Sequence, residues 1–207
     1  MRVKSAEKRR EIVVAAAELF VKLGYEHTSM AAISDRVGGS KATLYGYFAS
    51  KEDLLRAVLE YDVANAALLV FEEFPTKGDF QEGLTRLGIQ YLTGRLAALP
   101  IANVRTLASL PAGSTIGQEF YETILEPAWK VLAEHFGALM QSGRLREADP
   151  WIAAMHWKGL HDGELFEKRL IGALRRPDPK EVKRVATLAA DAFLKIYGPE
   201  KTAADHQ

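Results

Sequence analysis

The chain has 207 residues, of which 48% are hydrophobic, enough to bury one large core or two smaller ones. It has no cysteine, which excludes disulfides, thiolate nucleophiles and cysteine-ligated zinc and fits a reducing cytosol. The first ten residues are basic, but no continuous apolar stretch follows them. We therefore expect neither a signal peptide nor a membrane span, and we predict a cytoplasmic protein.

The 27 basic and 27 acidic residues cancel over the whole chain, but they are unevenly placed. Residues 1–51 contain nine Lys or Arg and five Asp or Glu, a net charge of +4, and the remainder carries −4. This asymmetry fits a DNA-facing module joined to one that does not face DNA. A basic start of this size is often only a solvated surface, so charge alone leaves DNA binding open.

Apolar residues recur with a period of 3.6 and without sustained alternation, which predicts an all-α fold of about nine helices. The first helix is expected over residues 6–23. A short second helix follows Thr28 and Ser29, either of which can cap it, and the Gly38-Gly39 pair ends it.

Ser40 is expected to cap a third helix over residues 41–48. Ser50, with Asp53 three residues later, opens a fourth helix that is expected to reach about Phe71. Proline and glycine residues then separate five further segments with helical periodicity, at about 79–98, 101–110, 114–142, 150–174 and 179–197.

Two short helices joined by a Gly-Gly-Ser turn have the geometry that lets the second helix enter the major groove of DNA. In that helix Leu44 and Phe48 lie four residues apart, and we expect them to face inward against Phe20 and Ile33. The remaining surface is small and rich in hydroxyl groups, so it can approach a duplex closely.

Each candidate for DNA contact has a chemical reason. Thr43 can bond a base or touch a thymine methyl, and the longer cationic and phenolic side chains reach phosphate oxygens. Residues at helix starts lie beside backbone amides that attract phosphate. The alternative for the two tyrosines is that they only pack. The candidates are Thr28, Ser40, Lys41, Ala42, Thr43, Tyr45, Tyr47 and Lys51.

One stretch of about fifty residues carries a specific pattern: Ile12-Val-Val-Ala-Ala-Ala-Glu-Leu-Phe20, Gly24-Tyr25, Thr28-Ser-Met30, Ile33, Leu44-Tyr45-Gly-Tyr47-Phe48, Ser50-Lys51-Glu52 and Leu54-Leu55. The pattern resembles the signature of the TetR family. The resemblance implies a three-helix helix-turn-helix domain over 1–52, and a helical effector-binding and dimerisation domain over 53–207. It also implies that Thr28, Lys41, Thr43, Tyr45, Tyr47 and Lys51 contact DNA, mostly its backbone.

Two positions depart from the family pattern. Ser34 stands where alanine is usual, and Gly38-Gly39-Ser40 stands where Gly-Val-Ser is common. Neither departure is expected to break the fold. We expect the extra glycine to loosen the turn and shift base contacts.

The second half resembles the AefR-like C-terminal domain found in part of the TetR family, through Phe120-Tyr121, Gly143-Arg-Leu145, Asp149-Pro150, Ala153-Ala154, Phe193-Leu194 and Tyr197-Gly198. The resemblance implies a homodimer in which helices near 150–174 and 180–197 pair with their copies. A homodimer also sets two recognition helices about 34 Å, or a multiple of it, apart, to match a palindromic operator in double-stranded DNA. The last helix carries an apolar stripe wider than a small monomer needs to bury: Val182, Val185, Leu188, Ala189, Ala192, Phe193 and Ile196.

The resemblance also implies a pocket for a small-molecule effector, among helices four to eight. Its candidate residues are aromatic or polar, although any one of them is more often core than pocket. They are Phe71, Tyr91, Asn103, Arg105, Trp129, Trp157, His161 and Glu164. His156 and His161 lie five residues apart, which is poorly phased for a shared metal, so we expect no metal and no other cofactor. We expect one histidine to face solvent and another to hydrogen-bond at the dimer seam.

The predicted function is transcriptional regulation, with a repressor that leaves its operator when the effector binds. A helical enzyme would have to use His156, His161, Asp162 or Glu164 as acid and base. The sequence has no nucleophile–base signature, phosphate loop or metal motif, so we assign no catalytic residue. The remaining alternative is a helical adaptor that binds protein alone, which would give no gel shift with DNA.

Overall fold

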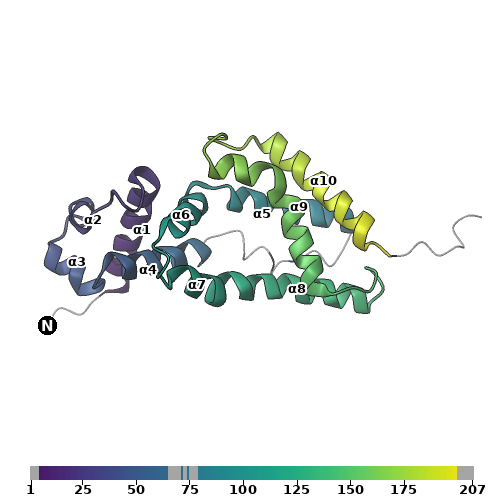
Figure 1. The fold of residues 1–207 in the computed structure, drawn as a ribbon, viewed down its shortest axis with the longest axis horizontal. Coiled ribbons are helices and arrows are strands. Elements are labelled where there is room, and N and C mark those ends of the chain that lie inside the picture. Colours follow the sequence, from purple (N-terminus) through teal and green to yellow (C-terminus); the bar gives the residue numbers. More distant parts are fainter. Residues whose placement is uncertain (1–4, 65–70, 72–73, 75–78, 200–207) are drawn as a thin grey trace, which may run out of the picture. The chain divides into compact units, whose positions relative to one another are not determined.

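The structure is a computed structural model that describes residues 5–64, 71, 74 and 79–199. These residues form helices joined by turns, with no strand among them, and the all-α prediction is confirmed (Figure 1). Packing divides the chain into unit 1, Met1–Asn65 with Ala97–Ile124, and unit 2, Ala66–Leu96 with Leu125–Gln207. Within the described ranges no helix combines the length and apolarity that a membrane crossing needs.

Unit 1 begins with the helix-turn-helix expected from the sequence. Its helices are α1 (Ala6–Leu23), α2 (Met30–Val37), α3 (Lys41–Tyr47), α4 (Lys51–Ala64), α6 (Ala98–Ser109) and α7 (Ile116–Phe120). The first four begin where the sequence predicts. The expected extension of the fourth helix falls on residues 65–70, outside the described residues. The functional boundary at residues 52/53 stays a prediction, since α4 and α6 pack against α1, and α7 packs against α4 and α6 in the same unit.

Serine hydroxyls cap the first four of these helices, and Ser5 caps α1 by accepting the Lys8 amide hydrogen at 3.1 Å. Ser29, rather than Thr28, caps α2 by accepting the Ala32 amide hydrogen at 3.1 Å. Ser40 caps α3 and Ser50 opens α4 in the same way, each through the amide three residues later and each at 3.0 Å. Each cap satisfies an amide that the helix itself leaves unpaired, which fixes where these short helices start.

The core of unit 1 holds α3 in place through a few large side chains. Leu44 and Phe48 are buried with Phe20 and Ile33, as predicted. Leu54 and other apolar residues of α4 complete the same cluster. Inward residues four apart on α3 leave its other sides facing outward, which makes it available as a recognition helix.

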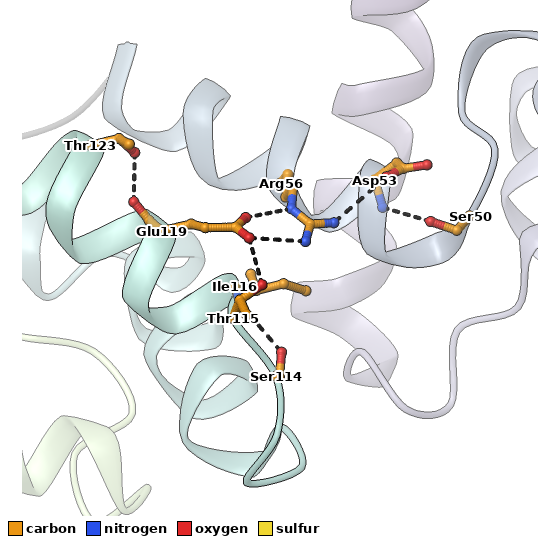
Figure 2. Close-up of polar contacts among 8 residues, drawn as sticks. All are labelled: Ser50, Asp53, Arg56, Ser114, Thr115, Ile116, Glu119 and Thr123. Carbon is orange, nitrogen blue, oxygen red and sulfur yellow. Dashed lines mark hydrogen bonds and ion pairs between the residues drawn. The ribbon is translucent and has the colours of Figure 1, made fainter.

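A polar network joins α4 to α7 within unit 1 (Figure 2). Arg56 Nε donates to Glu119 Oε2 at 2.7 Å, and the Thr115 hydroxyl donates to Glu119 Oε1 at 2.5 Å. Arg56 also lies 3.6 Å from Asp53, one turn earlier on α4. These hydrogen bonds lower the pKa of Glu119, so its carboxylate stays charged and the network ties α7 to the helix that follows the recognition helix.

Unit 2 contains α5 (Phe80–Arg95), α8 (Glu126–Gln141), α9 (Pro150–Leu170) and α10 (Pro179–Tyr197).

Two expected helix boundaries were wrong. Helix α6 starts at Ala98, before Pro100, because proline is tolerated in the first turn of a helix. The single helix expected over 114–142 is broken by a π-helix, η2 (Tyr121–Leu125), just before Pro127. Proline lacks the amide hydrogen that a regular turn would need there.

The packing of unit 2 depends on a close approach between α5 and α9. Gly88 of α5 faces His161, and a Cβ at position 88 would overlap His161 Nε2 and lie 2.9 Å from its Cδ2. The same Cβ would lie 3.2 Å from the Cβ of Ala186 on α10. Glycine is therefore required at position 88 by space, although it lowers helix propensity.

We predict that Gly88→Ala destabilises the protein by about 1–3 kcal/mol, because overpacking outweighs a propensity gain of at most about 1 kcal/mol. Urea unfolding at fixed protein concentration measures the change. In a His161→Ala background the loss should shrink by at least about 1 kcal/mol, since the overlapping ring is gone. Gly137→Ala in α8 is the control, because its Cβ would meet only Pro150, at 3.4 Å from Cγ and 3.7 Å from Cβ. An equal loss at positions 88 and 137 would contradict the steric account.

Candidate DNA interface and effector-binding core

The outward surface of α3 is built from small and hydroxylated residues. Lys41, Ala42 and Thr43 are exposed, and the Tyr45 side chain is 52% exposed. An open hollow of about 770 Å³ lies beside this surface, lined by Ser5, Glu7, Lys8, Glu11, Gly38, Gly39, Ser40, Ala42, Thr43, Gly46 and Tyr47. Small residues along the hollow let a bulky polymer come close to the helix backbone.

Thr43, the predicted base reader, is oriented by the cap of its own helix. Ser40 Oγ accepts the Thr43 amide hydrogen and also lies 2.9 Å from Thr43 Oγ1. This pair of contacts restricts the rotamer of Thr43 on the exposed surface. Ser40 and Thr43 are therefore held together as one structural element.

The amino-terminal turn of α1 is fastened to α3 and to the end of α2. The Ser5 amide donates to the Tyr47 hydroxyl at 3.0 Å. Lys8 Nζ donates to the Val37 carbonyl at 3.3 Å, and the Arg9 guanidinium lies 5.2 Å from the centre of the Phe48 ring. Part of the basic start of the chain thus braces the helix-turn-helix.

Thr28 and Lys51, both predicted at helix starts, are held differently. Thr28 is buried, and its hydroxyl donates to the Gly24 carbonyl at 2.8 Å, so this group is committed within unit 1. Lys51 is half-buried, with Nζ 4.1 Å from the centre of the Tyr25 ring and 3.4 Å from the Glu26 carbonyl oxygen. Burial lowers the pKa of Lys51. Burial, together with the nearby carboxylates of Glu52 and Glu26, raises the pKa of Tyr25 to about 12.

Unit 2 brings four of the predicted effector residues into one aromatic cluster. The Phe71 ring centre lies 6.1 Å from that of Tyr91, 5.2 Å from that of Trp129 and 5.7 Å from that of Trp157. Tyr91 also contacts both tryptophans, at 5.7 and 5.2 Å. All four are buried, and Phe71 touches each of the other three. These spacings are those of rings in direct contact.

The edge of this cluster carries paired charges. The Tyr91 hydroxyl donates to Asp162 Oδ1 at 2.9 Å, and Lys158 Nζ donates to Asp162 Oδ2 at 3.0 Å. Arg95 Nε lies 3.7 Å from the same carboxylate. Burial and the neighbouring carboxylate raise the pKa of Tyr91, so it remains a neutral donor.

Two buried ring nitrogens beside the cluster have no hydrogen-bond partner in the described residues, Trp157 Nε1 and His161 Nε2. His161 Nδ1 donates to the Trp157 carbonyl at 2.8 Å, which leaves Nε2 as the bare nitrogen of a neutral ring. That nitrogen is enclosed by Gly88. Burial lowers the pKa of His161 to about 4. The other histidine, His156, is exposed and bonds the Tyr197 hydroxyl at 2.6 Å.

Three predicted effector residues lie apart from the aromatic cluster. Asn103 is in unit 1, where its Nδ2 donates to the buried carboxylate of Asp62 at 2.7 Å. Arg105 is exposed on α6, also in unit 1. Glu164 is exposed on α9 and pairs with Arg184 at 2.6 Å.

Sequence reasoning left Arg95, Asp62 and Ser34 out of the candidate residues. Asp62 and Arg95 lie on helices α4 and α5 among apolar neighbours, and a charged residue on an apolar helix face signals a buried partner. Ser34 was noted only as a departure from the family pattern. The Ser34 hydroxyl donates to the Gly39 carbonyl across the turn, and residue type alone does not show that contact.

An exposed recognition helix behind a serine-capped turn, on an all-helical chain, defines a helix-turn-helix protein. Comparison with known families agrees. Residues 12–58 match the model of the tetR family of bacterial regulatory proteins. Residues 82–199, more than half of the chain, match the C-terminal domain of AefR-like transcriptional repressors. The chain therefore belongs to the TetR family of DNA-binding transcriptional regulators, which are not enzymes, and both resemblances seen in the sequence are confirmed.

Individual relatives support the same assignment. The chain is 40% identical over 78 residues to the transcriptional activator FasR of Mycolicibacterium smegmatis, covering 38% of this chain and 36% of FasR. It is 32% identical over 65 residues to the repressor AcnR of Corynebacterium diphtheriae, covering 31% and 34%. The chain thus aligns with little more than a third of each of these curated relatives.

Solved structures match over nearly the whole chain. A putative TetR-family regulator from Mesorhizobium loti is 27% identical and superposes with a TM-score of 0.85, covering 95% of this chain and all of the other. The flavonoid-responsive regulator FrrA is also 27% identical with the same coverage, at a TM-score of 0.70. The predicted fold, with an amino-terminal helix-turn-helix and a helical second domain, is confirmed.

The buried, neutral His161 predicts a pH dependence of stability. Its pKa is 6.5 when unfolded and about 4 when folded, so between these values the unfolded chain binds more protons. The free energy of unfolding should therefore be unaffected by this group above pH 6.5 and fall as pH drops from 6.5 to 4, by on the order of 3 kcal/mol. Urea unfolding across this range should show a shallower fall for His161→Gln. His27→Gln, at an exposed histidine, is the control and should keep the original slope.

Proposed function

We propose that this protein represses transcription by binding a palindromic operator as a homodimer, and that it leaves the operator when a small-molecule effector binds. The observation that carries the proposal is the exposed, hydroxylated surface of α3 beside an open hollow on a positively charged part of the chain. In this proposal DNA contact is confined to residues 1–52, while residues 53–207 bind the effector and the second subunit. Reading chromosomal DNA places the protein in the cytoplasm.

The DNA contacts divide into two kinds. Thr43, fixed by Ser40, is assigned to base edges, with Ala42 allowing close approach. Phosphate contacts are assigned to cationic and phenolic groups and to helix starts: Thr28, Lys41, Tyr45, Tyr47 and Lys51. For Thr28, whose hydroxyl is occupied, the contact would come from the first amides of α2 rather than from the side chain.

A homodimer is supported by apolar residues that unit 2 leaves uncovered. Of the stripe on α10, Val182, Val185, Ala189 and Phe193 are buried in the core, whereas Leu188 is 55% and Ile196 42% exposed. These two lie eight residues apart on one face of α10, with the half-buried Ala192 between them. On α9, Ile152 is 46% exposed, and exposed Gly159 and Gly163 allow close approach of a helix.

For the effector site we propose the aromatic cluster, with a neutral aromatic ligand that carries an oxygen acceptor. A planar ligand that displaces the Phe71 ring would replace the contacts of that ring with Tyr91, Trp129 and Trp157. The unpartnered Trp157 Nε1–H calls for an oxygen acceptor, and the nearby carboxylate of Asp162 is already paired with Lys158. The likeness to the flavonoid-responsive FrrA supports the same class, since flavonoids are oxygenated aromatic molecules.

The DNA proposal predicts different effects for Lys51 and Thr43. Duplexes are first selected from a random pool with the unaltered protein, and binding is measured by salt-dependent gel shift. Lys51→Ala should weaken binding to selected and random duplexes alike and lower the slope against salt by roughly one per lost phosphate contact. Thr43→Ala should change the ranking among selected duplexes. Equal losses on every sequence for both variants would contradict the division, and no shift with any duplex would favour the adaptor alternative.

The dimer proposal predicts that Leu188→Arg yields a monomer, because a buried unpaired charge cannot be tolerated in an apolar interface. Light scattering after size exclusion should give about twice the chain mass of 22.9 kDa for the unaltered protein and one mass for the variant. Ile171→Arg is the control: Ile171 is 72% exposed at the end of α9, away from the stripe, and this variant should stay dimeric. A dimeric Leu188→Arg protein would overturn this interface.

The effector proposal predicts binding of a flavonoid such as naringenin, measured by calorimetry. Trp157→Phe keeps the ring contacts but removes the N–H donor, so the dissociation constant should rise about threefold to tenfold, the value of one hydrogen bond. Trp151→Phe, at a half-buried tryptophan outside the four-ring cluster, is the control and should bind as the unaltered protein does. Unchanged affinity in Trp157→Phe would remove this donor from the site.

A further inference from the structure

The turn between α2 and α3 is closed by two backbone hydrogen bonds around a left-handed glycine. Gly38 has φ 69° and ψ 31°, and its amide donates to the Asp35 carbonyl at 3.3 Å. The Gly39 amide donates to the Ser34 carbonyl at 3.1 Å. This pairing is the Schellman motif, in which the chain reverses at the end of a helix.

A Schellman turn is usually also held by an apolar contact between the residue in the last helical turn and the residue after the left-handed glycine. In this chain those positions are Ser34 and Gly39, which cannot make that contact. Instead the Ser34 hydroxyl donates to the Gly39 carbonyl at 2.7 Å, and Ser34 is only 2% exposed. Ser34 and Gly39 are therefore joined by two hydrogen bonds, one from the backbone and one from the side chain.

Nothing in the geometry of Gly39 itself requires glycine. It is not among the glycines with positive φ, and a Cβ built on it would meet no heavy atom within 4 Å. A glycine at such a position leaves the backbone more conformations than another residue would. The Ser34 hydroxyl supplies the restraint that a side chain at position 39 would otherwise give.

The restrained peptide leads directly into the recognition helix. The carbonyl that Ser34 holds belongs to the peptide bond between Gly39 and Ser40. Ser40 in turn caps α3 through the Thr43 amide at 3.0 Å and contacts the Thr43 hydroxyl at 2.9 Å. A short series of hydrogen bonds thus runs from Ser34, buried in unit 1, to the residue assigned to base reading.

We propose that Ser34 is a positioning residue of the DNA interface: it sets the orientation of Ser40 and Thr43 through Gly39, and so governs base preference without touching DNA. This inference rests on the proposed DNA-binding function. The two departures from the family pattern, serine for alanine and glycine for valine, then form one compensating pair, in which a hydrogen bond replaces an apolar contact.

The expected effect is on selectivity more than on folding. Leu44 and Phe48 are buried in the core of unit 1, so we expect α3 to remain docked when Ser34 loses its hydroxyl. Base readout depends on the angle of the helix, whereas phosphate contacts by long side chains tolerate small shifts. Loss of the Ser34 hydrogen bond should therefore weaken binding to a preferred sequence more than it weakens binding to DNA in general.

The test compares Ser34→Ala, Gly39→Val and the double variant with the unaltered full-length protein. Each is measured on a duplex selected with the unaltered protein and on a random-sequence duplex of equal length. For Ser34→Ala we expect about tenfold weaker binding to the selected duplex and less than about twofold on the random one. Gly39→Val alone keeps the hydrogen bond but adds a side chain at the hollow, so its selectivity is the reference for the double variant. In the double variant the valine can supply the apolar contact, and selectivity should return.

Ser109→Ala is the matched control, because it removes another serine-to-carbonyl hydrogen bond in unit 1, to Thr106 at 2.9 Å, away from the turn. It should leave the ratio of selected to random binding unchanged. An unchanged ratio in Ser34→Ala, or an equal loss on both duplexes, overturns the positioning role while DNA binding by the unaltered protein stands. If selection with the unaltered protein enriches no sequence, the proposed function itself fails, and the inference fails with it. Recovery in the double variant distinguishes positioning from a general loss of stability.

Discussion

A helix of seven residues, the length of α3, makes too few internal hydrogen bonds to persist in water, so everything that this protein can do with DNA depends on how that helix is docked. Two buried side chains, Leu44 and Phe48, hold it from one side. These two side chains keep α3 packed on unit 1, but two apolar contacts along one face still allow the helix to tilt and to shift along its axis. Its direction has to come from its ends.

Both ends of α3 are restrained by polar contacts. At the start, the cap on Ser40 follows a closed turn whose carbonyl is held by a serine of α2. At the other end, the Tyr47 hydroxyl accepts the Ser5 amide, and a cation lies against the Phe48 ring. The two kinds of contact differ physically. The hydrophobic effect is not directional, whereas a hydrogen bond requires a narrow range of distances and angles. Buried apolar side chains therefore stabilise the packing of α3 on unit 1, and polar contacts at its two ends set the orientation of the helix.

The sequence predicted what depends on local chemistry. The bounds of α1, the serine that starts α3 and the inward face of Leu44 follow from periodicity and capping, and all agree with the structure. It did not predict contacts across space. The prediction placed Asn103 with Trp157, but the fold puts them in different units, because α6 packs with α1 and α4. The π-helix before Pro127 was likewise missed, because five residues are too few to show the longer period of a π-turn in the apolar pattern.

The chain also passes between the two units three times, after Asn65, Leu96 and Ile124. These crossings connect the two units covalently. The last crossing is the π-helix, and just before it Glu119 ties α7 to Arg56, five residues after Lys51 on α4. A π-turn is much rarer than the α-helices on either side of it, and such turns often lie at functional sites. In the proposed function the effector has to bind two conformations of the protein with different affinity, and a shift of their ratio from 1:99 to 99:1 takes a difference of about 5.5 kcal/mol.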